Sequence, residues 1–120
     1  MSLKEDINFS LWCDFIERDF LETRFKEIIK NGIIQGATSN PAIFESSITN
    51  SLAYKQQLDM LQANNAKTIY EELALTDIKR AAALLSDLHK NDADDGFISI
   101  EVDPLLCDDA AGTIEEGVRL

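Results

Sequence analysis

Residues 36–44 read Gly-Ala-Thr-Ser-Asn-Pro-Ala-Ile-Phe and come one residue after the apolar pair Ile33 and Ile34. Pro41 suits the first position of a helix because its fixed φ is already helical and its missing N–H would have no partner there. Asn40 then occupies the N-cap position, where its side chain can accept a hydrogen bond from a free helix N–H group. The stretch therefore predicts a strand that passes into a helix without an ordinary loop.

Polar side chains gather at this junction. Residues 33–38 form the predicted strand, and its two-residue period places Thr38 and Asn40 on one face. Ligands of parallel α/β folds bind where strands end and helices begin, so this position is a candidate site. The alternative is that Thr38, Ser39 and Asn40 only cap a helix, and the residues alone leave both interpretations open.

A second strand is predicted upstream, over residues 8–15, where apolar and polar side chains alternate. The helix after it is expected to begin at Asp19, with Glu22 completing a capping box, and to end at Asn31-Gly32. Its apolar stripe consists of Leu21, Phe25, Ile28 and Ile29. Strand, helix and strand joined by tight connections form a βαβ unit, which requires parallel strands.

The region after Pro41 contains more helix than one crossover needs. Short helices are predicted over residues 42–48 and 51–63. Thr68 and Glu71 form another capping box, and Thr76-Asp77 is expected to restart the helix that then runs to Lys90. These extra helices should lie in a layer outside the sheet.

A third strand is predicted over residues 97–102, with aliphatic side chains on one face and Phe97, Ser99 and Glu101 on the other. The last segment, residues 108–120, begins with acids that suit a helix N-terminus. It has no stop signal at Leu120, so we expect the chain to end within an element.

The mixed strand faces distinguish two architectures. In a doubly wound sheet both faces lie under helices, and strands are then nearly continuous apolar runs. Polar residues on one face instead favour the crowded interior of a (β/α)8 barrel. Because a closed barrel needs ~200 residues or more, we expect residues 1–120 to be the N-terminal part of a single TIM-barrel domain, with about three βα units plus extra helices.

The composition excludes several partners. Eleven basic and 22 acidic residues give a net charge of −11, which argues against binding to nucleic acid and to anionic membranes. The N-terminus lacks the apolar core of a signal peptide. Two isolated cysteines, Cys13 and Cys107, are typical of free thiols in a reducing compartment, so we expect a cytoplasmic protein.

Three polar residues are candidates for chemistry: Asp14, Asn40 and Glu101 each lie at or near the end of a successive predicted strand. The ends of parallel strands share one rim, and the first and third strands should lie ~10 Å apart. Two carboxylates in different surroundings can supply a base and an acid at neutral pH.

Three motifs resemble those of the transaldolase family, in the expected order and on the expected strands. They are LWCD at residues 11–14, GATSNPAIF at residues 36–44 and SIEVD at residues 99–103. The resemblance implies a (β/α)8 barrel that transfers a dihydroxyacetone unit in the pentose phosphate pathway. The donor is a ketose phosphate (sedoheptulose 7-phosphate or fructose 6-phosphate), and the acceptor is an aldose phosphate.

The resemblance also implies roles for individual residues. Asp14 would take the proton from the sugar hydroxyl as the C–C bond breaks, and Glu101 would activate the water of Schiff-base formation and hydrolysis. Asn40 and Thr38 would hold hydroxyls of the three-carbon unit. The family's Schiff-base lysine belongs to the fourth strand, which is outside this sequence, so these 120 residues are expected to be inactive alone.

The implied partners are sugar phosphates and the remainder of the barrel, and a homodimer is compatible with the resemblance. No cofactor or metal is implied, because the lysine iminium serves as the electron sink. Two alternatives stay open: a non-catalytic acidic α/β interaction module derived from this fold, and another class I aldolase on the same barrel.

Overall fold

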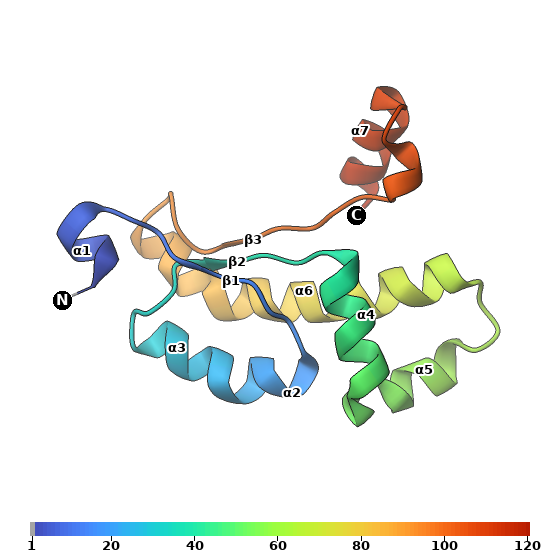
Figure 1. The fold of residues 1–120 in the computed structure, drawn as a ribbon, viewed down its shortest axis with the longest axis horizontal. Helices are drawn as coiled ribbons and strands as arrows, with labels where there is room; N and C mark the ends of the chain where they lie inside the picture. The colour runs from blue at the N-terminus through green and yellow to red at the C-terminus, as the bar shows by residue number, and fades with distance from the viewer. Residues whose placement is uncertain (1) are drawn as a thin grey trace.

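A computed structural model describes residues 2–120 and contains a parallel sheet of three strands in sequence order (Figure 1). The strands are β1 (Trp12–Cys13), β2 (Gly36–Ala37) and β3 (Phe97–Ile98). Trp12 pairs with Gly36, and Gly36 pairs with Phe97. The predicted order and parallel direction are therefore confirmed.

The regular strands are shorter than predicted, with two residues each. Backbone hydrogen bonds nevertheless continue the pairing on both sides of this core. The Gln35 N–H donates to the Leu11 carbonyl (2.8 Å), and the Thr38 N–H donates to the Cys13 carbonyl (2.9 Å). On the other edge, the Ser99 N–H donates to the Ala37 carbonyl (3.1 Å). The extended segments thus lie side by side up to the candidate residues.

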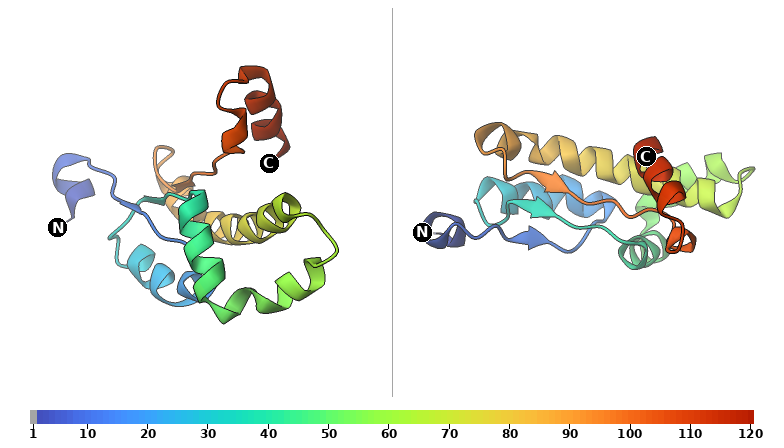
Figure 2. Two further views of the ribbon diagram at one scale, coloured as in Figure 1. Left: turned by 45° about the vertical axis from the view of Figure 1, so that its right-hand side comes forward. Right: turned by 90° about the horizontal axis from the view of Figure 1, so that it is seen from above.

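The helical segments α2–α3 and α6 lie on one face of the sheet (Figures 1 and 2). The helices of the chain are α1 (Leu3–Ile7), α2 (Arg18–Phe20), the π-helical turn η1 (Leu21–Phe25), α3 (Lys26–Lys30), α4 (Pro41–Asn50), the 3₁₀ turn η2 (Leu52–Tyr54), α5 (Lys55–Leu61), α6 (Ala66–Asn91), the 3₁₀ turn η3 (Pro104–Leu106) and α7 (Ala110–Arg119). The core joins Ala37 of the sheet to Phe25 and Leu85 of the helices, with Cys13 and Ile98 packed against it. The other face of the sheet carries exposed side chains, including Trp12 and Phe97.

The first crossover is one continuous helical segment formed by α2, η1 and α3. Its predicted start was wrong: the helix begins at Arg18, and the N-cap is Glu17, whose carboxylate accepts from the Phe20 N–H (2.8 Å). Glu22 does not close a capping box on Asp19; it pairs instead with Arg80 of α6 (2.9 Å). The predicted end is confirmed, since Gly32 adopts φ +66° directly after the last turn.

The second crossover comprises α4, η2, α5 and α6. Asn40 is the N-cap of α4, as predicted: its side-chain oxygen accepts from the Ile43 N–H (2.9 Å). The predicted capping box at Thr68 is wrong, because α6 begins at Ala66 and is capped by Asn65, three residues before Thr68. The predicted restart at Thr76-Asp77 is also wrong, because α6 runs unbroken for 26 residues. Asp77 is buried and is bonded to other elements, so it does not cap a helix.

Residues 99–103 lead from β3 to α7, which begins at the predicted acids: the Asp109 side chain accepts from the Gly112 N–H (2.9 Å). In Figures 1 and 2, α7 lies apart from the layer of α2–α3 and α6. Two ion pairs join it to α6, from Lys67 to Glu116 (2.6 Å) and from Arg119 to Glu71 (2.8 Å).

No helix within residues 2–120 combines the length and the apolar character needed to cross a bilayer.

Candidate active site

Asp14 and Thr38 come together at the carboxyl ends of β1 and β2. The Thr38 hydroxyl donates a hydrogen bond of 2.6 Å to the Asp14 carboxylate. This contact follows from the register, because both residues lie two positions beyond the pair Trp12 and Gly36. Asp14 is exposed, so its carboxylate is accessible to a ligand on the open face of the sheet.

A close approach of backbone to an aromatic ring organises this face. Gly36 lies so near Trp12 that a Cβ at residue 36 would be 2.7 Å from the indole ring and 2.9 Å from the Phe97 carbonyl oxygen. Only glycine fits between β1 and β3 at this point without displacing a neighbour. Gly36 thus allows the Trp12 ring to lie over the middle strand, beside the Asp14–Thr38 pair.

Asn40 follows Thr38 by two residues and is half-buried. Its side-chain oxygen is occupied by the helix cap, which fixes the orientation of the amide plane. Within residues 2–120 the side-chain nitrogen has no hydrogen-bond partner, so it remains a donor for a ligand. The two interpretations of this residue from sequence, as a cap and as a ligand-binding group, are therefore compatible.

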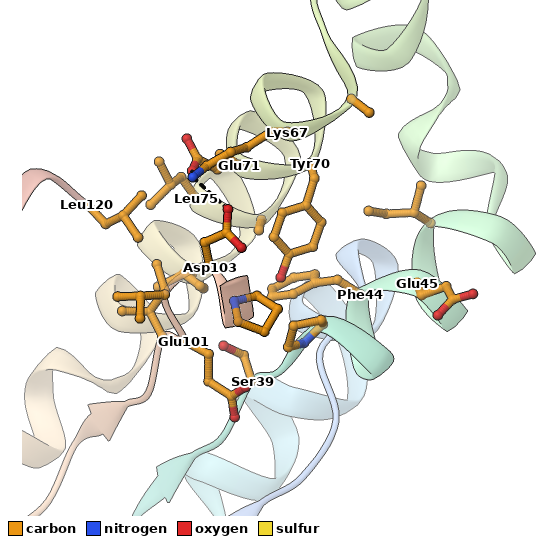
Figure 3. A pocket seen from close by; sticks show the side chains of 18 of the residues that line it. Ser39, Phe44, Glu45, Lys67, Tyr70, Glu71, Leu75, Glu101, Asp103 and Leu120 are labelled. Carbon is orange, nitrogen blue, oxygen red and sulfur yellow. Dashed lines mark hydrogen bonds and ion pairs between the residues drawn. The ribbon is translucent and has the colours of Figure 1, made fainter. Parts of the chain in front are cut away.

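Glu101 is exposed and lines a cavity of about 560 Å³ between α4, α6 and residues 100–104 (Figure 3). In the close-up its carboxylate lies beside Ser39. Burial raises the pKa of Tyr70, and the negative charge of Glu101 adds to that increase. The cavity is otherwise mostly apolar, with Phe44, Ile48, Ala74, Leu75, Ile78 and Ile100 among its lining residues.

The structure does not join all the candidates into one cluster. Across residues 2–120 no hydrogen bond links Glu101 to Asp14, Thr38 or Asn40, and neither Asp14 nor Thr38 lines the cavity. Ser39 links the segments after β2 and β3, because its hydroxyl donates to the Ser99 carbonyl (2.6 Å). Beyond Ser99 the chain leaves the sheet for α7, and Glu101 goes with it.

A lysine also lines this cavity. Lys67 is bonded to Glu116 (2.6 Å) and to Asp103 (2.9 Å), and these carboxylates raise its pKa to about 12. Its amine is therefore protonated at neutral pH and cannot attack a carbonyl. Lys67 holds α7 on α6 and is a poor candidate for a Schiff-base nucleophile.

In the described part of the chain, no three His, Cys, Asp or Glu side chains are grouped closely enough to hold a metal ion.

The sequence did not reveal a buried polar cluster of Arg18, Tyr54 and Asp77, whose first member follows Asp14 by four residues. The Tyr54 hydroxyl donates to the Asp77 carboxylate (2.7 Å) and accepts from the Arg18 N–H (3.1 Å). The Arg18 guanidinium donates to the same carboxylate (2.9 Å). Burial raises the pKa of Asp77, and the bonds from Tyr54 and Arg18 oppose that increase. No short-range pattern links residues separated by 59 positions, so this cluster required the structure.

These features define the class of protein. A parallel sheet with helices on one face, and with an accessible carboxylate and a hydroxyl at the carboxyl ends of its strands, is typical of α/β proteins whose sites lie at those ends. Residues 11–120 match the family described as Transaldolase/Fructose-6-phosphate aldolase. The chain therefore belongs to that family, as the three motifs predicted.

Named relatives agree. The chain is 54% identical over 112 residues to a transaldolase from Helicobacter pylori, covering 93% of this chain and 35% of that protein. It is 51% identical over 115 residues to a transaldolase from Campylobacter jejuni, covering 94% of this chain and 34% of that protein. The chain thus spans about a third of the length of these relatives.

Proposed function

We propose that residues 1–120 form the first part of a (β/α)8 barrel with transaldolase activity. The uncovered face of the sheet supports this proposal, because Trp12 and Phe97 are the kind of bulky side chains that fill a barrel interior. The remaining strands would close the barrel over them. The substrates are a ketose phosphate donor, fructose 6-phosphate or sedoheptulose 7-phosphate, and an aldose phosphate acceptor, as in the pentose phosphate pathway.

In the proposed mechanism, a lysine outside residues 1–120 forms the Schiff base with the ketose carbonyl. Asp14 accepts the proton of the sugar hydroxyl as the C–C bond breaks, and the iminium receives the electron pair. The 2.6 Å bond between Thr38 and Asp14 carries this assignment, since it holds the carboxylate at the strand ends. The bond also leaves the second carboxylate oxygen for the substrate.

Asn40 and Glu101 have the supporting roles. The capped amide of Asn40 presents its nitrogen to a hydroxyl of the three-carbon unit, with Thr38 beside it. Glu101 activates the water that enters and leaves during Schiff-base formation and hydrolysis. This role requires Glu101 to face the rim once the strand after β3 is in place, so the proposal includes a reorientation of residues 99–103. The protein would act in the cytoplasm.

The proposal is tested in the full-length protein that contains these residues. Asp14→Asn and Glu101→Gln should each lower turnover by ~10²-fold or more, in line with the usual contribution of general acid–base groups. Asp94→Asn, at an exposed acid of the loop before β3, serves as the control and should leave turnover unchanged. Near-normal turnover in both site variants would remove their assigned roles.

The family description also includes fructose-6-phosphate aldolase, which gives a second candidate activity. Product analysis with and without an aldose acceptor separates the two. A transaldolase releases little free dihydroxyacetone, because it passes this unit to the acceptor. An aldolase releases free dihydroxyacetone even when no acceptor is present.

A further inference from the structure

The segment that follows Asp14 is held by the helices of the second crossover. The Ser47 hydroxyl of α4 donates to the carbonyl of Ile16 (2.5 Å). The Ser51 hydroxyl, at the end of the same helix, donates to the carboxylate of Glu17 (2.7 Å). Ile16 is fully buried, so these bonds fix the path of the chain immediately after the candidate acid.

Arg18 follows Glu17 directly and is hydrogen-bonded to three elements, η2, α5 and α6. Its backbone N–H donates to the Tyr54 hydroxyl, and its guanidinium donates to Asp77 of α6 and to Gln57 of α5 (2.8 Å). The guanidinium also lies over the Tyr54 ring, 4.5 Å from its centroid. Arg18 is thereby held in both its backbone and its side chain.

The desolvation penalty of this buried polar cluster argues that the cluster does more than stabilise the fold. Tyr54 and Asp77 are 0% and 1% exposed, and burying a carboxylate with a guanidinium incurs a desolvation penalty that can cancel the attraction. Apolar residues of similar volume commonly give equal or greater stability. Unlike an apolar core, the polar cluster makes directional contacts. Each hydrogen bond defines where Arg18 lies relative to α6.

We propose that the cluster of Arg18, Tyr54 and Asp77 is a positioning device for Asp14. The inference rests on the proposed function, in which Asp14 is the proton acceptor. Thr38 holds the Asp14 carboxylate from one side, and the cluster fixes the chain four residues later. The extra helices between β2 and β3, which exceed what a crossover needs, thus act as a support for the loop after β1.

The test uses the full-length protein and the variant Tyr54→Phe, which removes one hydroxyl and keeps the ring in the core. Loss of the hydroxyl frees the Arg18 N–H and one Asp77 oxygen. A displaced general base slows C–C cleavage, and a shift of about 1 Å can cost up to ~10²-fold in rate. We expect kcat to fall by ~10-fold or more, with KM little changed.

Borohydride trapping with fructose 6-phosphate separates positioning from loss of folded protein. Formation of the Schiff base does not need Asp14 in the proposed mechanism, so the trapped amount per molecule should equal that of the parent while product release is slow. Leu85→Ala, a fully buried control about two turns further along α6, should lower stability and reduce both readouts in the same proportion.

A second variant keeps the test sound if Tyr54→Phe folds poorly. Ser51→Ala removes the bond to Glu17 at a half-buried position and should show the same split between trapping and release, to a smaller extent. Parental kcat in both folded variants would overturn the positioning role. So would an equal loss of trapping and release.

Asp14→Asn in the same assay tells the two proposals apart. If this variant retains parental turnover, the proposed function fails. If it alone loses turnover, only the positioning role fails.

Discussion

The Thr38 hydroxyl and the Asp14 carboxylate, 24 residues apart in the chain, are joined by a hydrogen bond of 2.6 Å across the ends of two parallel strands. A short bond from a neutral donor to a carboxylate orients the acceptor. The pair is therefore both a product of the sheet register and the part of the candidate site that the structure assembles most completely.

Thr38→Val should separate the hydroxyl from the shape of the side chain, because valine keeps the volume and removes the donor. In the full-length protein we expect kcat to fall by ~10-fold, as Asp14 loses its fixed orientation. Thr38→Ser retains a donor and should keep most of the activity. Steady-state kinetics of the three proteins measure this, and equal kcat values for the valine and serine variants would contradict the role of the bond.

Asn40→Asp should leave the fold intact and weaken substrate binding. Aspartate caps a helix as well as asparagine does, so the bond to the Ile43 N–H is kept, but the side-chain NH₂ donor is lost. We expect an unchanged unfolding midpoint and a raised KM for the ketose phosphate. Asn40→Ala, the comparison variant, should also destabilise the chain by about 1 kcal/mol through loss of the cap. A KM for the aspartate variant equal to the parent's would argue against Asn40 as a ligand-binding group.

Gly36→Ala should destabilise the sheet, because the added Cβ meets the Trp12 ring at 2.7 Å and the Phe97 carbonyl oxygen at 2.9 Å. The expected cost is about 1–3 kcal/mol, the usual range for overpacking. Gly117→Ala is the control: it lies within α7, its Cβ would have only an ordinary contact at 3.8 Å, and alanine favours helix. Urea unfolding of the two variants should move in opposite directions, and equal stability of Gly36→Ala and the parent would refute the close packing.

The attachment of α7 should depend on pH through Glu116. The hydrogen bond with Lys67 holds the pKa of Glu116 below its ordinary value of 4.5. A carboxyl with a lowered folded-state pKa stabilises the fold fully above the unfolded value, and that contribution is lost as the pH falls through the folded-state pKa. Glu116→Gln should therefore flatten the pH dependence of the urea midpoint below about pH 4.5. Glu115→Gln, an exposed neighbour, should keep the parental profile; identical profiles for the two variants would exclude the Glu116–Lys67 pair as the cause.

The parts of the fold that sequence reasoning predicted depend on local chemistry. Asn40 before Pro41 caps a helix, and Gly32 ends one at positive φ, because each effect involves only a few neighbouring residues. The parallel order of the strands followed from tight connections around a helix. The Asp14–Thr38 contact follows from the same register.

The errors arose where distant partners competed with local patterns. Asp19 with Glu22, and Thr68 with Glu71, have the spacing of capping boxes, but the two glutamates pair with Arg80 and Arg119. Asp77 has the sequence appearance of a helix start, yet its carboxylate is bonded to residues 23 and 59 positions away. Such partners are set by the packing of α6 on the first crossover, on η2 and on α7, which no single stretch of sequence encodes.

Borohydride reduction of the full-length protein in the presence of fructose 6-phosphate, followed by peptide mapping, tests the central claim most directly. The account predicts one covalent adduct on a lysine that lies outside residues 1–120. This adduct has three carbons in the parent, whereas Asp14→Asn, which cannot cleave the C–C bond, gives a six-carbon adduct on the same lysine and loses product release. An adduct on Lys67 or on any other lysine of residues 1–120 would contradict it.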